Sequence, residues 1–301
     1  MKQVPLTEAN RADNEKVDRD NDDTTHQIAE DIAYKRLAIV NVVFFGRPGA
    51  ADREWVLIDA GLPGFAGAIK RAAVERFGDH SRPAAILMTH GHFDHIGSLE
   101  TLADEWDVPI YAHLLEQPYL DGHSAYPPPD PSVGGGLMAL SSPLFPPGPI
   151  NVGRRLRLLP DDHSVPHMDG WRWVHTPGHT PGHVSFWRER DRSLIVGDAF
   201  VTTRQESAYA VILQKPEMHG PPMYYTPDWD SARESVRTLA ELQPKLVVTG
   251  HGRAMQGREM RLALDVLARD FDHIARPKHG RYTREPAEAD ATGTTYVPSK
   301  S

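Results

Sequence analysis

The stretch Thr89-His90-Gly91-His92-Phe93-Asp94-His95-Ile96-Gly97 places three imidazoles and one carboxylate within six consecutive positions. It directly follows an apolar run, residues 84–88, whose length is typical of a buried strand. Side chains two positions apart in extended backbone point to the same side, so His90 and His92 can share one metal ion. Asp94 and His95, at the start of a predicted helix, diverge enough to reach a second ion. Since imidazole and carboxylate are ligands that zinc accepts, the stretch predicts a catalytic metal site.

Ordinary polar residues of a loop are the alternative explanation, because the chain contains 16 histidines. This combination at this spacing should arise by chance in only about a few chains per thousand. The context lowers that chance further, since residues 96–106 are predicted to form the helix that follows the strand.

At these residues the chain resembles the metallo-β-lactamase superfamily, whose signature is a His-x-His-x-Asp-His run after a strand. The resemblance continues in the family's order over residues 35–255. A ligand histidine in a Gly-His-Thr-Pro-Gly setting corresponds to His179, and an acidic ligand after a strand corresponds to Asp198. A late histidine after a strand corresponds to His251, and the early Asp-x-Gly turn is matched by Asp59-Ala60-Gly61.

The resemblance implies two metal ions held by seven ligands. Each ligand follows a predicted strand, where loops from one sheet edge converge on a pocket. Asp198 would bridge the two ions, because a carboxylate has two oxygens whereas a neutral imidazole offers one free nitrogen. The expected catalytic residues are Asp94 and Asp198. Asp94 could accept or deliver a proton. The remaining ligands divide between the ions as His90, His92 and His179 for the first, and Asp94, His95 and His251 for the second.

The activity implied by the resemblance is that of a dinuclear metal-dependent hydrolase with two zinc ions per chain, manganese or iron being possible substitutes. A metal-bound hydroxide would attack an ester, lactone, thioester or related substrate. The β-lactamases proper lack a bridging aspartate at this place, so the glyoxalase II-like or lactonase-like branch is favoured. The lactonase branch often has a tyrosine three positions after that aspartate, where this chain has Val201.

Alternative functions stay open at this point. An iron-dependent oxidoreductase of the same superfamily would use the same ligands, although no attached flavin-binding segment is visible in this length. A β-lactam hydrolase is a further alternative. A catalytically silent binding module is least favoured, because all seven ligand positions are filled.

Composition is consistent with a soluble, cytoplasmic enzyme that acts on a small molecule. A hydrophobic content of 40% over 301 residues is enough for one large core. The net charge of −8 gives no general attraction to nucleic acid or to an anionic membrane. With no cysteine, neither disulfides nor thiolate ligands are available. Residues 1–30 are polar and contain no apolar segment, so they predict neither a signal peptide nor a membrane anchor.

Three regions are expected along the chain: a polar N-terminal arm (1–30), a catalytic domain (31–275) and a polar C-terminal tail (276–301). The arm is either a disordered tail or a docking segment. Predicted strands and helices alternate in the domain, which indicates a layered α/β fold. The family's fold is an αβ/βα sandwich, with two mixed sheets face to face and helices outside. Predicted strands cover 37–45, 55–59, 84–88, 109–112, 155–159, 171–175, 184–187 and 194–196, and predicted helices cover 65–77, 96–106, 229–242 and 255–274.

Two segments outside the motifs are expected to shape the pocket. Residues 119–153 are rich in proline and glycine and predict a long irregular loop, either a cover over the pocket or a subunit contact in a homodimer. Residues 202–228 contain Tyr209, Tyr224 and Tyr225, which could place aromatic walls near the metals or simply pack in the core. Asp59 is expected to orient a ligand, and His183 is expected to be structural rather than a fourth ligand of the first ion.

Overall fold

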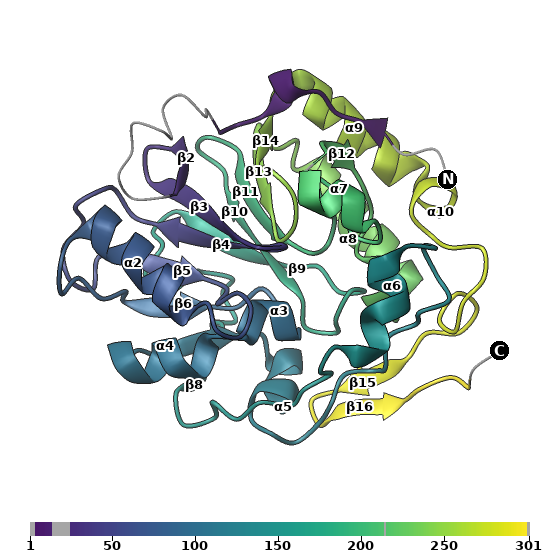
Figure 1. Cartoon of the computed structure of the whole chain (residues 1–301), viewed down its shortest axis with the longest axis horizontal. Helices are drawn as coiled ribbons and strands as arrows, with labels where there is room; N and C mark the ends of the chain where they lie inside the picture. Colours follow the sequence, from purple (N-terminus) through teal and green to yellow (C-terminus); the bar gives the residue numbers. More distant parts are fainter. Residues whose placement is uncertain (1–3, 14–24, 214, 300–301) are drawn as a thin grey trace.

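A computed structural model describes residues 4–13, 25–213 and 215–299. Two mixed β-sheets pack face to face and helices cover their outer faces (Figure 1), as the family resemblance implied. In the described part of the chain, no helix has the length and apolar character needed to cross a membrane.

The first sheet has seven strands in sequence order from β2 to β8. Its first four strands pair antiparallel and the pairs from β5 to β8 are parallel. The strands are β2 (His26–Ala29), β3 (Ile32–Leu37), β4 (Val40–Phe45), β5 (Val56–Ile58), β6 (Ala85–Leu87), β7 (Ile110–Ala112) and β8 (Leu156–Leu158).

The second sheet has five strands in the order β14-β13-β11-β10-β9. The pair β11 and β13 is parallel and the other pairs are antiparallel. The strands are β9 (Trp171–His175), β10 (Val184–Arg188), β11 (Ser193–Gly197), β13 (Leu246–Thr249) and β14 (Met255–Gln256).

The alternation of side chains along each strand explains why these apolar runs form a sandwich, because successive residues point to opposite faces. On β11, Ile195 lies in the core between the two sheets, whereas Val196 faces the helices of the second sheet. On β6, Leu87 lies between the sheets and Ile86 faces the helices of the first sheet. Strands buried on both faces must be apolar throughout, and the sequence shows this as short continuous runs rather than alternation.

Two helices cover each sheet. The first sheet is covered by α2 (Ala66–Phe77) and α4 (Leu99–Trp106), and the second by α8 (Trp229–Glu241) and α9 (Gly257–Arg269). Helix α8 begins at a capping aspartate, Asp228, which accepts hydrogen bonds from the backbone N–H groups of residues 230 and 231. Shorter helices are α3 (Phe93–Ile96), α5 (Gln117–Leu120), α6 (Leu137–Ser141), α7 (Ala208–Leu213) and α10 (Phe271–Ile274).

Most predicted elements are present, but three are divided. The strand expected over 37–45 is broken by a tight turn at Ala38, whose φ is 57°, so that β3 ends and β4 begins there. The helix expected over 96–106 becomes α3 and α4, separated by Gly97 and Ser98. The helix expected over 255–274 is β14 followed by α9 and α10, because Gly257 at φ 92° turns the chain out of the strand.

The described parts of the first 30 residues contact the sandwich. Strand β1 (Val4–Pro5) pairs with β12 (Glu217–Met218), and β2 belongs to the first sheet. Buried Asp13 accepts a hydrogen bond of 2.7 Å from the Tyr34 hydroxyl. The sheet therefore begins inside the segment expected to be an arm, and the acidic run Asp18, Asp20, Asp22 and Asp23 lies outside the described residues.

The segment expected to be a polar tail contains a hairpin of β15 (Glu288–Asp290) and β16 (Gly293–Tyr296), which lies beside α5 in Figure 1. Thr294 donates from its backbone N–H to Ser124 at 3.1 Å, and its hydroxyl lies 3.1 Å from the Tyr119 hydroxyl. Polar hydrogen bonds, which hydropathy does not register, thus attach the hairpin to the 119–153 loop.

Candidate metal centre

All seven predicted ligands are buried at one edge of the sandwich. They follow strands β6, β11 and β13 or lie in the turn between β9 and β10, and these strand ends meet at the same edge. In chain order they are His90 and His92 in the loop after β6, Asp94 and His95 in α3, His179 between β9 and β10, Asp198 after β11, and His251 after β13.

The ligand atoms form overlapping groups, in each of which all atoms lie within 4.8 Å of one another. One group is His90, His92 and His179, termed here the first ligand set. Another is Asp94, His95 and His251, termed here the second ligand set. A third group joins Asp198 to His90 and His95, one residue from each set.

Asp198 lies between the two ligand sets. Its Oδ2 is 3.4 Å from His179 Nε2 and 3.0 Å from His251 Nε2. The same oxygen is 3.7 Å from His95 Nε2. Within the first set, His92 Nδ1 and His179 Nε2 face each other at 2.9 Å. Ring nitrogens and carboxylate oxygens therefore converge from both sheets on one small volume.

The arrangement fits a pair of divalent ions. Among the described residues, His90 Nε2, His95 Nε2 and Asp198 Oδ1 are buried and have no hydrogen-bond partner. Orphaned buried polar atoms cost about 1–3 kcal/mol each, and a metal bond would satisfy them. Gly250 keeps this volume open, since a Cβ there would lie 2.1 Å from Asp198 Oδ1.

Neighbouring groups set the orientation of several ligands. The ring nitrogen His95 Nδ1 lies 2.8 Å from Asp59 Oδ2, and His251 Nδ1 lies 2.7 Å from the carbonyl oxygen of Ile39. His183 accepts a hydrogen bond of 2.8 Å from the Asp198 backbone N–H. Such contacts leave the Nε2 atoms of both ligand imidazoles for a metal. Asp59 thus contacts a candidate ligand imidazole, and His183 contacts the backbone of Asp198.

The two ligand sets differ in proton affinity. Burial lowers the pKa of His90 and His179 well below the ordinary value and lowers the pKa of His92 to about 3. Burial also opposes protonation of His95 and His251, but nearby carboxylates, including Asp198, raise the pKa of both. The first set is therefore neutral and ready for a metal over a wider pH range than the second.

A family model, described as the metallo-beta-lactamase superfamily, matches residues 36–251. The chain belongs to this superfamily. In Bacillus subtilis (strain 168), "Probable metallo-hydrolase YflN" is 47% identical over 236 residues, covering 78% of this chain and 89% of the relative. "Probable metallo-hydrolase YybB" of the same organism is 29% identical over 196 residues, covering 65% of this chain and 74% of the relative. This relationship makes the chain a metallo-hydrolase at the level of the family.

Solved structures of superfamily members share the fold. BLEG-1, a B3 metallo-β-lactamase, is 25% identical with a TM-score of 0.50, and the match covers 80% of this chain and 97% of that chain. A β-lactamase domain protein from Burkholderia ambifaria is 20% identical with a TM-score of 0.55, and covers 82% of this chain and 76% of that chain. The second likeness shows the fold alone.

Aromatic side chains contact the candidate ligands and the residues next to them. The Tyr225 ring stacks on His92 with centroids 4.5 Å apart, and its buried hydroxyl has no hydrogen-bond partner among the described residues. From the 119–153 loop, Tyr126 contacts His92 edge-on at 4.7 Å and Phe145 stacks on Phe93 at 5.0 Å. The loop thus reaches the candidate metal centre. Tyr209, in contrast, is 71% exposed.

Glu116 and Tyr126 lie beside the centre although neither was predicted from the sequence. Glu116 ends the 3-10 turn Leu114–Glu116 directly after β7, at the same sheet edge as the ligands. Its position after a predicted strand was a usable signal, but neither residue belongs to the motifs that define the superfamily.

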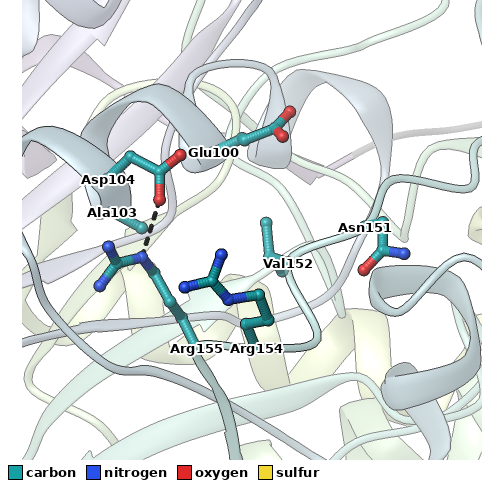
Figure 2. Close-up of a pocket in the computed structure, with 7 residues that line it drawn as sticks. All are labelled: Glu100, Ala103, Asp104, Asn151, Val152, Arg154 and Arg155. Atoms are coloured by element: carbon teal, nitrogen blue, oxygen red, sulfur yellow. Dashed lines mark hydrogen bonds and ion pairs between the residues drawn. The ribbon is translucent and has the colours of Figure 1, made fainter.

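A surface hollow of about 450 Å³ lies away from this centre, beside α4 (Figure 2). Arg155 and Asp104 face each other across it at 2.8 Å. None of the seven candidate ligands is among the residues that line it. The lining residues are Glu100, Ala103, Asp104, Asn151, Val152, Arg154 and Arg155.

Proposed function

We propose that the chain is a dinuclear hydrolase that holds two zinc ions and acts on an ester, lactone or thioester. The observation that carries the proposal is the Asp198 carboxylate, whose Oδ2 lies within 3.4 Å of a ring nitrogen from each ligand set. One carboxylate within reach of both sets supports a shared pair of ions rather than two independent sites. The same donors suit manganese and iron, so metal content is part of the test.

When bound, such a pair of ions lowers the pKa of a shared water and polarises the carbonyl oxygen of the substrate. The residues of the chain hold the centre and handle the proton. Burial raises the pKa of Asp94 above the ordinary carboxyl value, and its Oδ2 lies 3.4 Å from His251 Nε2. A carboxylate among the ligand side chains is close enough to the reacting groups to accept or deliver a proton. We therefore assign proton transfer to Asp94 and assign the joining of the two ligand sets to Asp198.

The aromatic surroundings support a small organic substrate. Tyr225, Phe93 and Phe145 provide apolar ring surface beside the candidate ligands. The buried hydroxyl of Tyr225 has no hydrogen-bond partner among the described residues, and we assign it to a substrate oxygen. It comes from a different segment than the tyrosine of the lactonase branch, whose place is occupied here by Val201.

β-Lactam hydrolysis is the second candidate, because the match to BLEG-1 reaches 25% identity over 80% of this chain. Asp198, which lies between the two ligand sets, argues against it, since the family resemblance implies no aspartate at this place in the β-lactamases proper. An iron-dependent oxidoreductase would be recognised by its metal content.

The test combines elemental analysis with a hydrolysis screen over aryl esters, lactones, thioesters and β-lactams. We expect two zinc ions per chain and turnover of at least one of the first three classes, lost on chelation and restored by zinc. The double variant His90→Ala, His179→Ala provides the inactive control. A single ion with no gain on adding zinc or manganese would contradict the dinuclear centre. Turnover of β-lactams alone would establish the second candidate.

A further inference from the structure

Glu116 is a fully buried carboxylate that belongs to neither ligand set, at 0% exposure. Four hydrogen-bond donors surround it. Its Oε2 accepts from the backbone N–H of Gly91 at 2.9 Å and from the Tyr126 hydroxyl. Its Oε1 accepts from the Thr180 hydroxyl at 2.7 Å and from the backbone N–H of Gly182 at 2.8 Å. A buried ionisable group is costly unless it is paired in this way.

These donors belong to the loops that carry the first ligand set. Gly91 stands between His90 and His92, and Thr180 directly follows His179. The first loop follows β6 of the seven-stranded sheet, whereas the second joins β9 and β10 of the five-stranded sheet. One carboxylate therefore links two loops that come from opposite sides of the sandwich.

The fit between Glu116 and the second loop is close. A Cβ at position 182 would lie 2.7 Å from the Glu116 backbone nitrogen and 2.9 Å from its Oε1. Real side chains do not approach that closely without a shift, so glycine is required for Gly182 to donate. The carboxylate consequently fixes the separation of the two loops to within the tolerance of a hydrogen bond.

We propose that Glu116 is a positioning residue for the first ion: it holds His90, His92 and His179 at the spacing that this ion requires, without touching it. This inference rests on the proposed dinuclear centre. The second ligand set has other anchors, since Asp59 contacts His95 at 2.8 Å and the Ile39 carbonyl contacts His251 at 2.7 Å. Loss of the Glu116 carboxylate should therefore lower the affinity for the first ion and leave the affinity for the second ion nearly unchanged.

The test is Glu116→Gln in the full-length protein. Glutamine keeps the shape but has one acceptor oxygen in place of two, so it can accept from the backbone N–H of Gly91 or of Gly182 but not from both. Metal-free protein is titrated with Zn2+ against a chromophoric chelator to obtain two stepwise dissociation constants. The same variants are loaded with Co2+, whose visible absorption reports ligand geometry independently of turnover.

Two reference variants identify which ion is affected. His251→Ala, in the second ligand set, provides the Co2+ spectrum of a protein that retains the first site. Asp130→Asn is the matched control, because Asp130 is 6% exposed and accepts backbone hydrogen bonds from Ser132 at 3.0 Å and Arg281 at 2.6 Å. None of its hydrogen-bond donors adjoins a ligand of the first set.

We expect Glu116→Gln to raise one of the two Zn2+ dissociation constants by about tenfold or more. This is the scale seen when groups that support metal ligands are lost. The other constant should change by less than about twofold, and the first-site Co2+ absorption should shift. Asp130→Asn should leave both constants unchanged. The inference would be overturned if both Zn2+ dissociation constants of Glu116→Gln were unchanged. It would also be overturned if both constants rose equally and the Tm fell in parallel. Parent protein that binds fewer than two ions would instead overturn the proposed dinuclear centre.

Discussion

Asp198 joins the two ligand sets because its carboxylate is buried at 2% exposure among histidines from both. Its backbone N–H donates to His183 at 2.8 Å, which fixes the loop after β11. An amide in its place would keep the volume but offer one acceptor oxygen and no negative charge.

We accordingly expect Asp198→Asn to lower the affinity for both ions by about tenfold or more. His251→Ala should mainly lower the affinity for the second ion. Zinc per chain after dialysis against a weak chelator measures both outcomes, with Asp130→Asn as the control. Full metal content and an unchanged rate in Asp198→Asn would show that the aspartate does not bridge.

The Tyr225 hydroxyl gives a second prediction at the residue scale. It is buried beside His92 with no protein partner among the described residues, so removal should affect a substrate rather than the fold. Tyr225→Phe should retain both ions and lower kcat/KM by about tenfold or more if the hydroxyl stabilises a developing oxyanion. The matched control is Tyr209→Phe, whose ring is 71% exposed. Equal kcat/KM values in the two variants would show that the Tyr225 hydroxyl takes no part in the reaction.

The pKa directions predict the order of metal loss in acid. Raised pKa values in His95 and His251 keep these rings protonated to a higher pH, where the proton competes with the metal. The pKa of His92, lowered to about 3, leaves that ring free for metal in the same range. As pH falls from 8 to 4, metal content should therefore drop from two ions to a plateau of one. Simultaneous loss of both ions, measured after rapid gel filtration, would contradict this order.

At the scale of elements, the 119–153 loop extends from the first sheet to the centre. Tyr126 near its start contacts Gly91 and His92, whereas α6 and the following turn carry Leu137, Leu140 and Leu144, each at least 67% exposed. The two parts of the loop should therefore have different roles.

Replacing residues 137–144 with a short Gly-Ser linker should retain both ions, since no ligand contact is removed. Substrate preference should change, because Phe145, which stacks on Phe93 beside Asp94, would lose its anchored position. Relative kcat/KM over a panel of esters, lactones and thioesters measures this effect. An identical profile in parent and variant would make the segment a connection only.

At the scale of the whole molecule, each ligand set draws on both sheets. The first combines residues after β6 with His179, and the second combines residues of α3 with His251. Bound ions would therefore cross-link the sandwich at the edge where the sheets meet.

Chelation should consequently lower the Tm of the parent protein. A ligand that binds only the folded state at 100 times its Kd stabilises by about 2.7 kcal/mol per site. Thermal unfolding with and without EDTA, followed by zinc addition, measures the shift. His90→Ala should show a smaller response to EDTA than the parent. A Tm that does not respond to chelator would exclude metal binding at this site.

The sequence by itself determined the strand-and-helix order, the superfamily and the seven candidate ligands, because apolar runs and closely spaced His-x-His-x-Asp-His chemistry are local properties. In the structure the seven candidate ligands come together at one sheet edge. Glu116 escaped prediction because its partners lie at Gly91 and Gly182, distant in sequence, and only the packing of two sheets makes them neighbours. The hairpin at residues 288–296 was missed for the same reason, because hydrogen bonds to a loop distant in sequence hold it in place. A hydropathy pattern detects only the apolar side chains of the segment itself.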